Sequence, residues 1–321
     1  MKQLKKLQTG QAGFTLLELL VVITLIAALA VGALIAYDGV GDKAQAAAAA
    51  DANVKIDNAI RQYKAVTNVY PNQWDNLVAE DTSLIEALPT QLLSVVSRWS
   101  LGAAASDVTL SLGRAGINEL QNWQVWTKSS NAAGVIPNLA HNESFNSINA
   151  VESEHFENDG VGDDGPILNI AVVPGLGGTV GTCQASGVTI PATTVDPDGA
   201  GPLDAGDNYI QNRYSDALEG DECHLVVALG FGSDAAASTT GKSVSIGKAP
   251  SFSKTDTANP DNNIDPNQHY SRYIGLFLVG SDTSEDGNIT GSEYLAKARL
   301  LTIIAPDGTI ADQNLATAVQ N

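Results

Sequence analysis

The sequence has few basic residues, few sulfur-containing residues and few aromatics. Its 321 residues include 17 Lys and Arg against 36 Asp and Glu, 2 Cys, 1 Met and 6% aromatic residues. The net charge of −19 argues against nucleic acid as a partner, because proteins bind phosphate backbones by replacing counterions with Lys and Arg. Two cysteines cannot build a multi-thiolate zinc site or a disulfide-dense miniature domain.

Catalytic motifs are also scarce. The four histidines are not at zinc-binding spacings, and no nucleophile elbow is present. The glycine-rich run 175–181 has neither the spacing nor the following helix pattern of a dinucleotide-binding fingerprint. The sequence therefore predicts a protein that is not an enzyme. Its 44% of apolar residues are enough for a substantial core.

The few basic residues are unevenly placed. Lys2, Lys5 and Lys6 stand in the segment 1–13, which contains no acid, and the following segment 14–36 carries only one charge, Glu18. As a helix, the segment 14–36 would be about 35 Å long, enough to cross a bilayer core of roughly 30 Å. The sequence predicts a single membrane span over 14–36, with the lysines in the cytoplasm and the remaining chain outside.

Two alternatives remain open for this segment. A secretory signal peptide would have an apolar region of only about 7–15 residues before a small-residue cleavage site, and the tract Ala27–Ala30 is compatible with one. A carboxylate inside an apolar span costs about 2.5–3.5 kcal/mol on insertion scales, so such residues usually have a functional partner. The alternative for Glu18 is a side chain that only reaches the near membrane interface.

The run GFTLLE at residues 13–18 carries a family resemblance. Placed after a lysine-bearing leader and before an apolar helix, it resembles the processing site of type IV prepilins and pseudopilins. The resemblance implies cleavage between Gly13 and Phe14 by a prepilin peptidase, followed by N-methylation of Phe14. It also implies an assembly role for Glu18, whose carboxylate would pair with the terminal amine of a neighbouring subunit and set the register of the packed helices.

The same resemblance implies a domain organisation and a location. Residues 1–13 would be a cleaved leader, residues 14–66 a long N-terminal helix, and residues 67–321 a periplasmic or extracellular head. The chain would enter the inner membrane as a single-pass protein. An inner membrane assembly platform would then build it into a periplasmic or extracellular filament, with copies of itself or other pilin-like subunits.

Two functions are compatible with this organisation. The first is a structural subunit of a type IV pilus or of a type II secretion pseudopilus. The alternative is a minor subunit at the filament tip, a binding module for adhesion or for cargo recognition. Pilus and pseudopilus both stay open at this stage.

The fold class follows from periodicity. Apolar residues recur at spacings of three and four between Ala49 and Tyr63, which indicates a helix with one buried stripe. Short β-like runs follow at 167–173, 224–229, 273–279 and 299–304, the last before a hairpin turn signal at 305–308. The sequence predicts an α+β fold, in which a helix with a transmembrane and an amphipathic half packs on a mostly antiparallel β head. Long acidic loops are expected, because the stretch between Lys128 and Arg213 contains many acids and no Lys or Arg.

The segment 282–293 carries the most specific motif of the head. It matches the EF-hand loop, with oxygen-bearing side chains at positions 1, 3, 5, 9 and 12 and Gly at position 6. The expected calcium ligands are Asp282, Ser284, Asp286, Asn288 through its carbonyl, Thr290 and Glu293. A strand before the loop and a short helix near Ser292 would flank it. The alternative is a solvated acidic turn.

Cys183 and Cys223 flank a second acidic loop, residues 196–207. This loop is a weaker calcium candidate, with a plain flexible loop as the alternative. Outside the cytoplasm we expect the two cysteines to form a disulfide. Closing about 40 residues would be worth at most about 4 kcal/mol by the chain-entropy argument.

Overall fold

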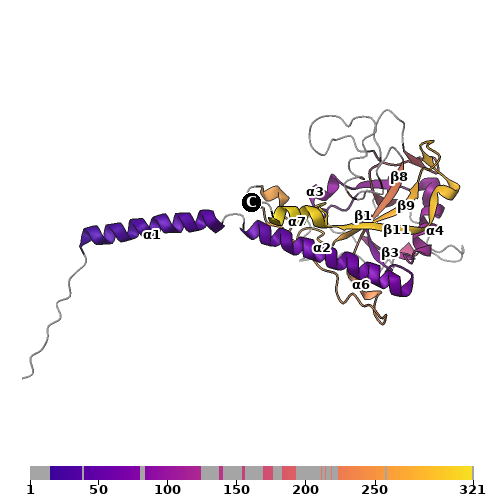
Figure 1. The fold of residues 1–321 in the computed structure, drawn as a ribbon. Helices are drawn as coiled ribbons and strands as arrows, with labels where there is room; N and C mark the ends of the chain where they lie inside the picture. Colours follow the sequence, from indigo (N-terminus) through magenta and orange to yellow (C-terminus); the bar gives the residue numbers. More distant parts are fainter. Residues whose placement is uncertain are drawn as a thin grey trace, which may run out of the picture.

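The computed structural model describes residues 15–37, 40–79, 84–123, 137–139, 154–155, 169–175, 183–192, 211, 214, 218, 223–256 and 259–319. The N-terminal part forms two consecutive helices. Helix α1 (Leu16–Tyr37) projects away from the head as a rod, and α2 (Val40–Thr67) lies along the head (Figure 1). No helix in the described ranges is both long enough and apolar enough to cross a membrane. The span predicted for 14–36 begins at a residue outside those ranges and stays a prediction.

The head combines short helices with a mixed sheet. Its strands are β1 (Trp74–Ala79), β2 (Ser97–Ser100), β3 (Glu119–Trp123), β4 (Glu154–His155), β5 (Asn169–Val173), β6 (Gln184–Ala185), β7 (Val188–Thr189), β8 (His224–Gly230), β9 (Ile274–Ser281), β10 (Asn288–Ile289) and β11 (Tyr294–Ile304). Its α-helices are α3 (Thr90–Leu93), α4 (Ala105–Arg114), α6 (Ser233–Ala237) and α7 (Ala311–Val319). Short 3-10 turns are η1 (Gly102–Ala104), η3 (Pro137–Leu139), η5 (Pro260–Asn262) and η6 (Gly291–Glu293).

An eight-stranded sheet is the centre of the head. Its main path runs β11-β9-β8-β1-β3-β4, and β5 pairs with both β8 and β2. Most pairs are antiparallel, as predicted, but β1 and β3 are parallel. A small sheet, β10-β6-β7, stands beside it, with β10 and β6 parallel. The predicted α+β class with antiparallel pairing is therefore confirmed.

Both faces of the central strands are buried. Along β8, Leu225, Val227 and Leu229 belong to one hydrophobic cluster, while Val226 and Ala228 belong to the other. The first cluster contains residues of α2 and α4, and the second contains a leucine of α3. A strand covered on both faces has no solvent side, which explains why β8 is apolar from Leu225 to Leu229 instead of alternating.

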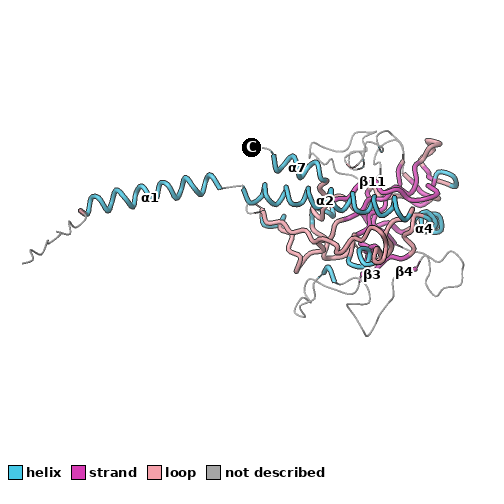
Figure 2. The backbone as a smooth tube through the Cα atoms, turned by 60° about the horizontal axis from the view of Figure 1, so that its bottom comes forward, coloured by secondary structure: helices cyan, strands magenta, loops and turns pink. Residues whose placement is uncertain are grey.

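Helix α2 presents the predicted apolar stripe to the head. Ile56, Ile60 and Tyr63 are all buried. The helix ends where Asn68 adopts a left-handed backbone conformation (φ 64°) and its N–H donates to the carbonyl of Lys64 over 2.7 Å. Asparagine tolerates this conformation, which is the usual way to end a helix in the absence of glycine. α2 runs along the head (Figure 2).

The prediction of a C-terminal hairpin is wrong. The turn exists, since the Gly308 N–H donates to the carbonyl of Ala305 and the Ala305 N–H donates to the carbonyl of Thr309. The chain then continues into helix α7, not into a second strand. A helix follows the turn because residues 311, 314 and 318 are spaced to lie on one side of a helix. The acidic loops around 157–166 and 196–207 lie outside the described residues.

Candidate functional site

Glu18 lies in the first turn of α1 and interacts with Thr15. The Thr15 backbone N–H donates to Glu18 Oε2 over 2.9 Å, and the Glu18 N–H donates to Thr15 Oγ1 over 3.2 Å. This reciprocal pair is a capping box, which satisfies two backbone donors that a helix start otherwise leaves unpaired. The Thr-x-x-Glu spacing is a known signature of this arrangement and could have predicted it from the sequence. Gly13 and Phe14 lie outside the described residues.

The surface of α1 is apolar along its described length. The exposed fraction is 84% for Leu16, 70% for Leu29 and 57% for Val31, and similar side chains between them are exposed as well. Contiguous apolar surface of this extent marks a site that interacts with another protein or with a membrane. The head cannot cover α1, because the helix projects away from it (Figure 1).

In the loop 282–293, Asp282 is the central side chain. It is 2% exposed, and its Oδ2 accepts a hydrogen bond from the Gly287 N–H over 2.6 Å. Its Oδ1 accepts from the Asp286 N–H and from Ser284 Oγ. Gly287 has φ of 82°, which a side chain would oppose, so the Gly at the sixth position is required by the turn.

Glu293 closes the same loop from its other end. Its Oε1 accepts from the Ser284 N–H over 2.9 Å, and its Oε2 accepts from the Thr290 N–H over 2.9 Å. Hydrogen bonds from Thr290, Ser284 and Thr283 lower the pKa of Glu293 to about 2, so the group is ionised at neutral pH. Ser284 thus touches both carboxylates, and the two acids at the ends of the motif are brought together.

The side chains of Asp286 and Asn288 each accept a hydrogen bond from a backbone N–H group. Asp286 Oδ1 accepts from the Asn288 N–H over 2.8 Å, and Asn288 Oδ1 accepts from the Gly187 N–H over 2.9 Å. The Asn288 side chain therefore contacts the 183–192 hairpin. The main-chain carbonyl of Asn288 is left as the predicted calcium ligand. In the described part of the chain, no group of three or more His, Cys, Asp or Glu side chains is arranged to hold a metal ion. The expected helix near Ser292 is a 3-10 turn followed by strand β11.

The predicted disulfide between Cys183 and Cys223 is present. The two Cα atoms lie 5.4 Å apart, and both cysteines are buried. Cys183 stands just before β6 and Cys223 just before β8, so the bond ties the small sheet to the large one. The Asp282 N–H donates to the Cys223 carbonyl over 2.8 Å. The disulfide therefore also supports the start of the 282–293 loop.

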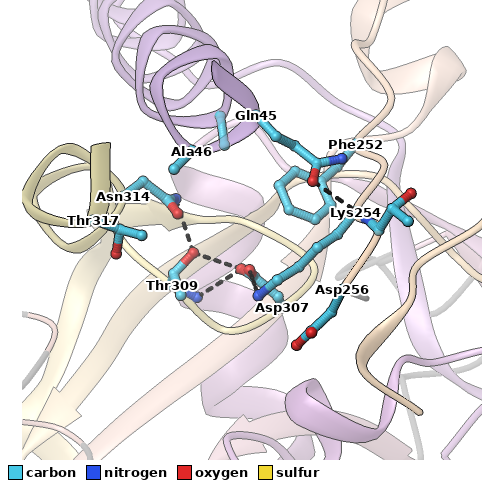
Figure 3. A pocket seen from close by; sticks show the side chains of 11 residues that line it. Gln45, Ala46, Phe252, Lys254, Asp256, Asp307, Thr309, Asn314 and Thr317 are labelled. Carbon is cyan, nitrogen blue, oxygen red and sulfur yellow. Dashed lines mark hydrogen bonds and ion pairs between the residues drawn. The ribbon is translucent and has the colours of Figure 1, made fainter. Parts of the chain in front are cut away.

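A cavity of about 240 Å³ opens between the start of α2, helix α7 and the segment 252–256 (Figure 3). Two of its charged groups pair with each other, since Lys254 Nζ lies 3.0 Å from Asp307 Oδ2. Thr309 Oγ1 donates to Asp307 Oδ1 and accepts from Asn314 Nδ2. These contacts fix α7 on the head.

Comparison with known proteins places the N-terminal segment in a family. Residues 8–34 match the family model of the prokaryotic N-terminal methylation motif. No curated protein and no solved structure matches the chain. The matched range contains Gly13, Phe14, the Thr15–Glu18 capping box and most of α1. The chain therefore carries the prokaryotic N-terminal methylation motif in its N-terminal segment, which supports the resemblance to type IV pilins and pseudopilins.

Proposed function

We propose that the chain is a structural subunit of a type IV pilus or a type II secretion pseudopilus. The single observation that carries this proposal is that most of α1, whose described apolar side chains are exposed, lies within the matched methylation motif. The segment from Phe14 to Ala36 contains one charge, so it suits the membrane before assembly. After assembly, the same side chains pack against helices of other subunits. The head then stays outside the membrane.

Glu18 has a role in each of these two states. In the free subunit it caps the start of α1 through Thr15. Cleavage before Phe14 would create a terminal amine, and methylation would keep its positive charge. In the filament, the Glu18 carboxylate of one subunit pairs with the amine of the next. A buried charge without a partner is strongly unfavourable, so this pair selects one axial stagger.

The mature protein provides the test. Mass spectrometry of the chain from sheared filaments should show an N-terminus at Phe14, with the mass increase of one methyl group. The same filaments should contain the chain as a main component. A full-length chain that keeps residues 1–13, or the absence of the chain from every filament preparation, would contradict the proposal. Abundance also separates a main structural subunit from a scarce subunit at the tip.

We further propose that the loop 282–293 binds calcium. Asp282 and Glu293 converge on Ser284, and no Lys or Arg in the described ranges forms an ion pair with either acid. Carboxylate, hydroxyl and carbonyl oxygens are the donors that calcium prefers. When bound, the ion would neutralise two carboxylates and hold the loop against the disulfide-linked hairpin. The ligands would be Asp282, Ser284, Asp286, the Asn288 carbonyl, Thr290 and Glu293.

Calorimetry on the metal-stripped, detergent-solubilised full chain tests this site. We expect calcium to release or absorb heat at one site, and to raise the free energy of unfolding by about 2.7 kcal/mol at 100 times its Kd. The matched control is Asp282→Asn with Glu293→Gln, which keeps one accepting oxygen on each side chain and removes both charges. This variant should lose the calcium response and keep the fold. An equal response in the variant, or no heat with the original chain, would refute the site.

A further inference from the structure

The loop 282–293 is attached at its first residue to the start of strand β8. The Asp282 N–H donates to the Cys223 carbonyl over 2.8 Å. In the neighbouring residue pair of the two segments, His224 Nδ1 lies 2.9 Å from Ser281 Oγ, which is hydrogen-bonding distance. These two contacts fix the backbone of Asp282 relative to that of Cys223.

The middle of the loop is attached to a different segment, the 183–192 hairpin. Strand β10 of the loop pairs with β6 of the hairpin. Three backbone N–H groups of the hairpin donate to the loop: those of Gln184, Ser186 and Gly187 donate to the Gly287 carbonyl, the Ile289 carbonyl and Asn288 Oδ1 over 2.8, 2.8 and 2.9 Å. The position of this half of the loop therefore depends on the hairpin.

The disulfide joins the two segments that hold the loop. Cys223 provides the carbonyl that accepts from Asp282, and Cys183 directly precedes Gln184, whose N–H donates to Gly287. Asp282 Oδ2 also accepts from the Gly287 N–H over 2.6 Å, so the two halves of the loop meet at this pair. The loop, the hairpin and the start of β8 thus form a closed ring of covalent and hydrogen bonds, and the disulfide is one link of that ring.

The hairpin depends on its attachments to keep β6 in place. Strands β6 and β7 contain two residues each, and a short two-stranded hairpin is marginally stable at best in water. Its second half has contacts of its own, since Trp99 Nε1–H donates to the Thr189 carbonyl over 3.0 Å and the Gly175 N–H donates to the Pro191 carbonyl over 2.9 Å. Without the disulfide, we expect the hairpin to stay on the folded head through these contacts, while β6 and the loop lose their fixed positions.

We propose that the disulfide between Cys183 and Cys223 sets the calcium affinity of the loop, so that the oxidised head binds calcium more tightly than the reduced head. This inference rests on the proposed calcium site, where Asp282, Glu293 and the groups between them offer only oxygen donors, which suit calcium. Groups behind the ligands of a metal typically change its affinity 10- to 100-fold when they are removed. We therefore expect the Kd for calcium to rise about tenfold or more when the disulfide is absent.

Thermodynamic linkage makes the effect reciprocal. If the disulfide strengthens calcium binding by some factor, calcium stabilises the disulfide against reduction by the same factor. In the reaction with dithiothreitol, the S–S bond breaks, each cysteine sulfur takes up one hydrogen, and the dithiol closes into a cyclic disulfide. Disulfides persist outside the cytoplasm, where thiols are not kept reduced. The loop therefore reaches its full calcium affinity only after the head has left the cytoplasm.

Calorimetry on the metal-stripped, detergent-solubilised full chain provides the first test. The variant with Cys183→Ser and Cys223→Ser should bind calcium with a Kd raised about tenfold or more. The matched control is Leu92→Ala, which destabilises the head at a buried site of the second hydrophobic cluster, and that cluster contains no described residue of the loop or of the hairpin. The Kd of this control should stay within about twofold of that of the original chain. An unchanged Kd in the cysteine variant, or an equal rise in Leu92→Ala, would overturn the inference.

A redox titration of the original chain avoids any effect of substitution. The chain is equilibrated with mixtures of reduced and oxidised dithiothreitol, at saturating calcium and with the calcium chelated, and its free thiols are counted by alkylation and mass spectrometry. The ratio of reduced to oxidised dithiothreitol at half reduction should rise with calcium by the same factor as the Kd in the first test. The near-ultraviolet circular dichroism of the reduced, metal-free chain should keep the signal of a folded head. Equal ratios with and without calcium, or unfolding of the reduced chain, would contradict the inference.

The proposed calcium site and this inference fail in different ways. If the original chain shows no calcium response, the calcium site falls, and the inference falls with it. If the oxidised and the reduced chain bind calcium equally well, only the inference falls, because the site then does not depend on the disulfide.

Discussion

Replacing Glu18 by alanine is expected to leave the chain inserted and processed, but to lower its incorporation into filaments by about 10²-fold to 4 × 10³-fold. The mature N-terminus would carry a positive charge into the packed helices. Removing its carboxylate partner leaves that charge unpaired, which costs about 3–5 kcal/mol in a buried pair. A difference of about 1.4 kcal/mol corresponds to a factor of ten in an equilibrium constant. The measurement is the ratio of the chain in sheared filaments to the chain in membranes.

The capping box makes a sharper comparison possible. Glu18 Oε2 accepts from the Thr15 N–H, and glutamine can replace glutamate in this position of a capping box. Glu18→Gln therefore keeps the cap and removes the charge, whereas Glu18→Ala removes both. If the charge pair governs assembly, the losses of incorporation into filaments for Glu18→Gln and Glu18→Ala should agree to within a factor of a few.

Thr15→Ala is the complementary variant, because it removes the hydroxyl that accepts from the Glu18 N–H and keeps the carboxylate. Loss of such a cap typically costs about 1 kcal/mol, so a loss of incorporation near fivefold is expected at most. Normal assembly of Glu18→Gln together with failure of Glu18→Ala would show that the cap matters and the charge pair does not. The assembly role would then have to be abandoned.

Local patterns predicted the parts of the fold that depend on neighbouring residues. The stripe from Ala49 to Tyr63 predicted a helix with one buried side, and Ile56 and Ile60 are indeed buried on α2. The pattern did not anticipate that Asn53 is buried within that stripe. The structure offers no partner for either of its side-chain polar atoms in the described ranges. Periodicity therefore located the buried side, but not every residue type on it.

Pairings between distant segments were not accessible in this way. The parallel pair of β1 and β3 joins segments far apart in the chain, for example Trp74 with Leu120. The segment Trp74–Ala79 is buried on nearly every residue, so it shows no alternation that would mark a strand. Local sequence also failed to predict the element after Gly308. The expected turn is present there, but helix α7 follows it. A turn fixes the local reversal of the chain, and only the following packing decides between strand and helix.

The loop 282–293 shows both what local spacing predicts and which long-range pairing it misses. Spacing within residues 282–293 predicted that Asp282 and Glu293 would face a common centre, and both contact Ser284. It could not predict strand β10, whose partner β6 lies far earlier in the chain. That pairing holds the Asn288 side chain against Gly187, whereas the ligand expected from spacing is the Asn288 carbonyl.

Replacing Trp74 by alanine is expected to lower the free energy of unfolding of the head by about 3–5 kcal/mol. The indole is fully buried, and its ring centroid lies 5.2 Å from that of Phe231 and 5.0 Å from that of Phe277 in edge-to-face geometry. Tyr70, just beyond the end of α2, packs on Phe277 in the same way. The cluster therefore joins the end of the long helix to the centre of the sheet.

The size of the effect follows from how closely this site is packed. A Cβ on Gly275 would lie only 2.8 Å from the Trp74 ring, so the sheet backbone approaches the indole directly and cannot collapse far into the space that alanine leaves. The Trp74 Nε1–H also donates to the Pro71 carbonyl over 2.8 Å, and that buried carbonyl would lose its partner. Trp74→Phe should be less damaging, because it keeps an aromatic ring in contact with Phe277.

The measurement is denaturant unfolding of the solubilised full chain, followed by circular dichroism in the aromatic and peptide regions. Since native domains have only about 5–15 kcal/mol of stability, the loss is a large part of the total for the head. Signal from α1 should persist, because that helix projects away from the sheet (Figure 1). Val66→Ala, an exposed site on α2, is the control and should change the stability by less than about 0.5 kcal/mol. A change below about 1 kcal/mol for Trp74→Ala, far short of the usual cost of emptying a core aromatic site, would mean that the aromatic cluster does not hold α2 to the head.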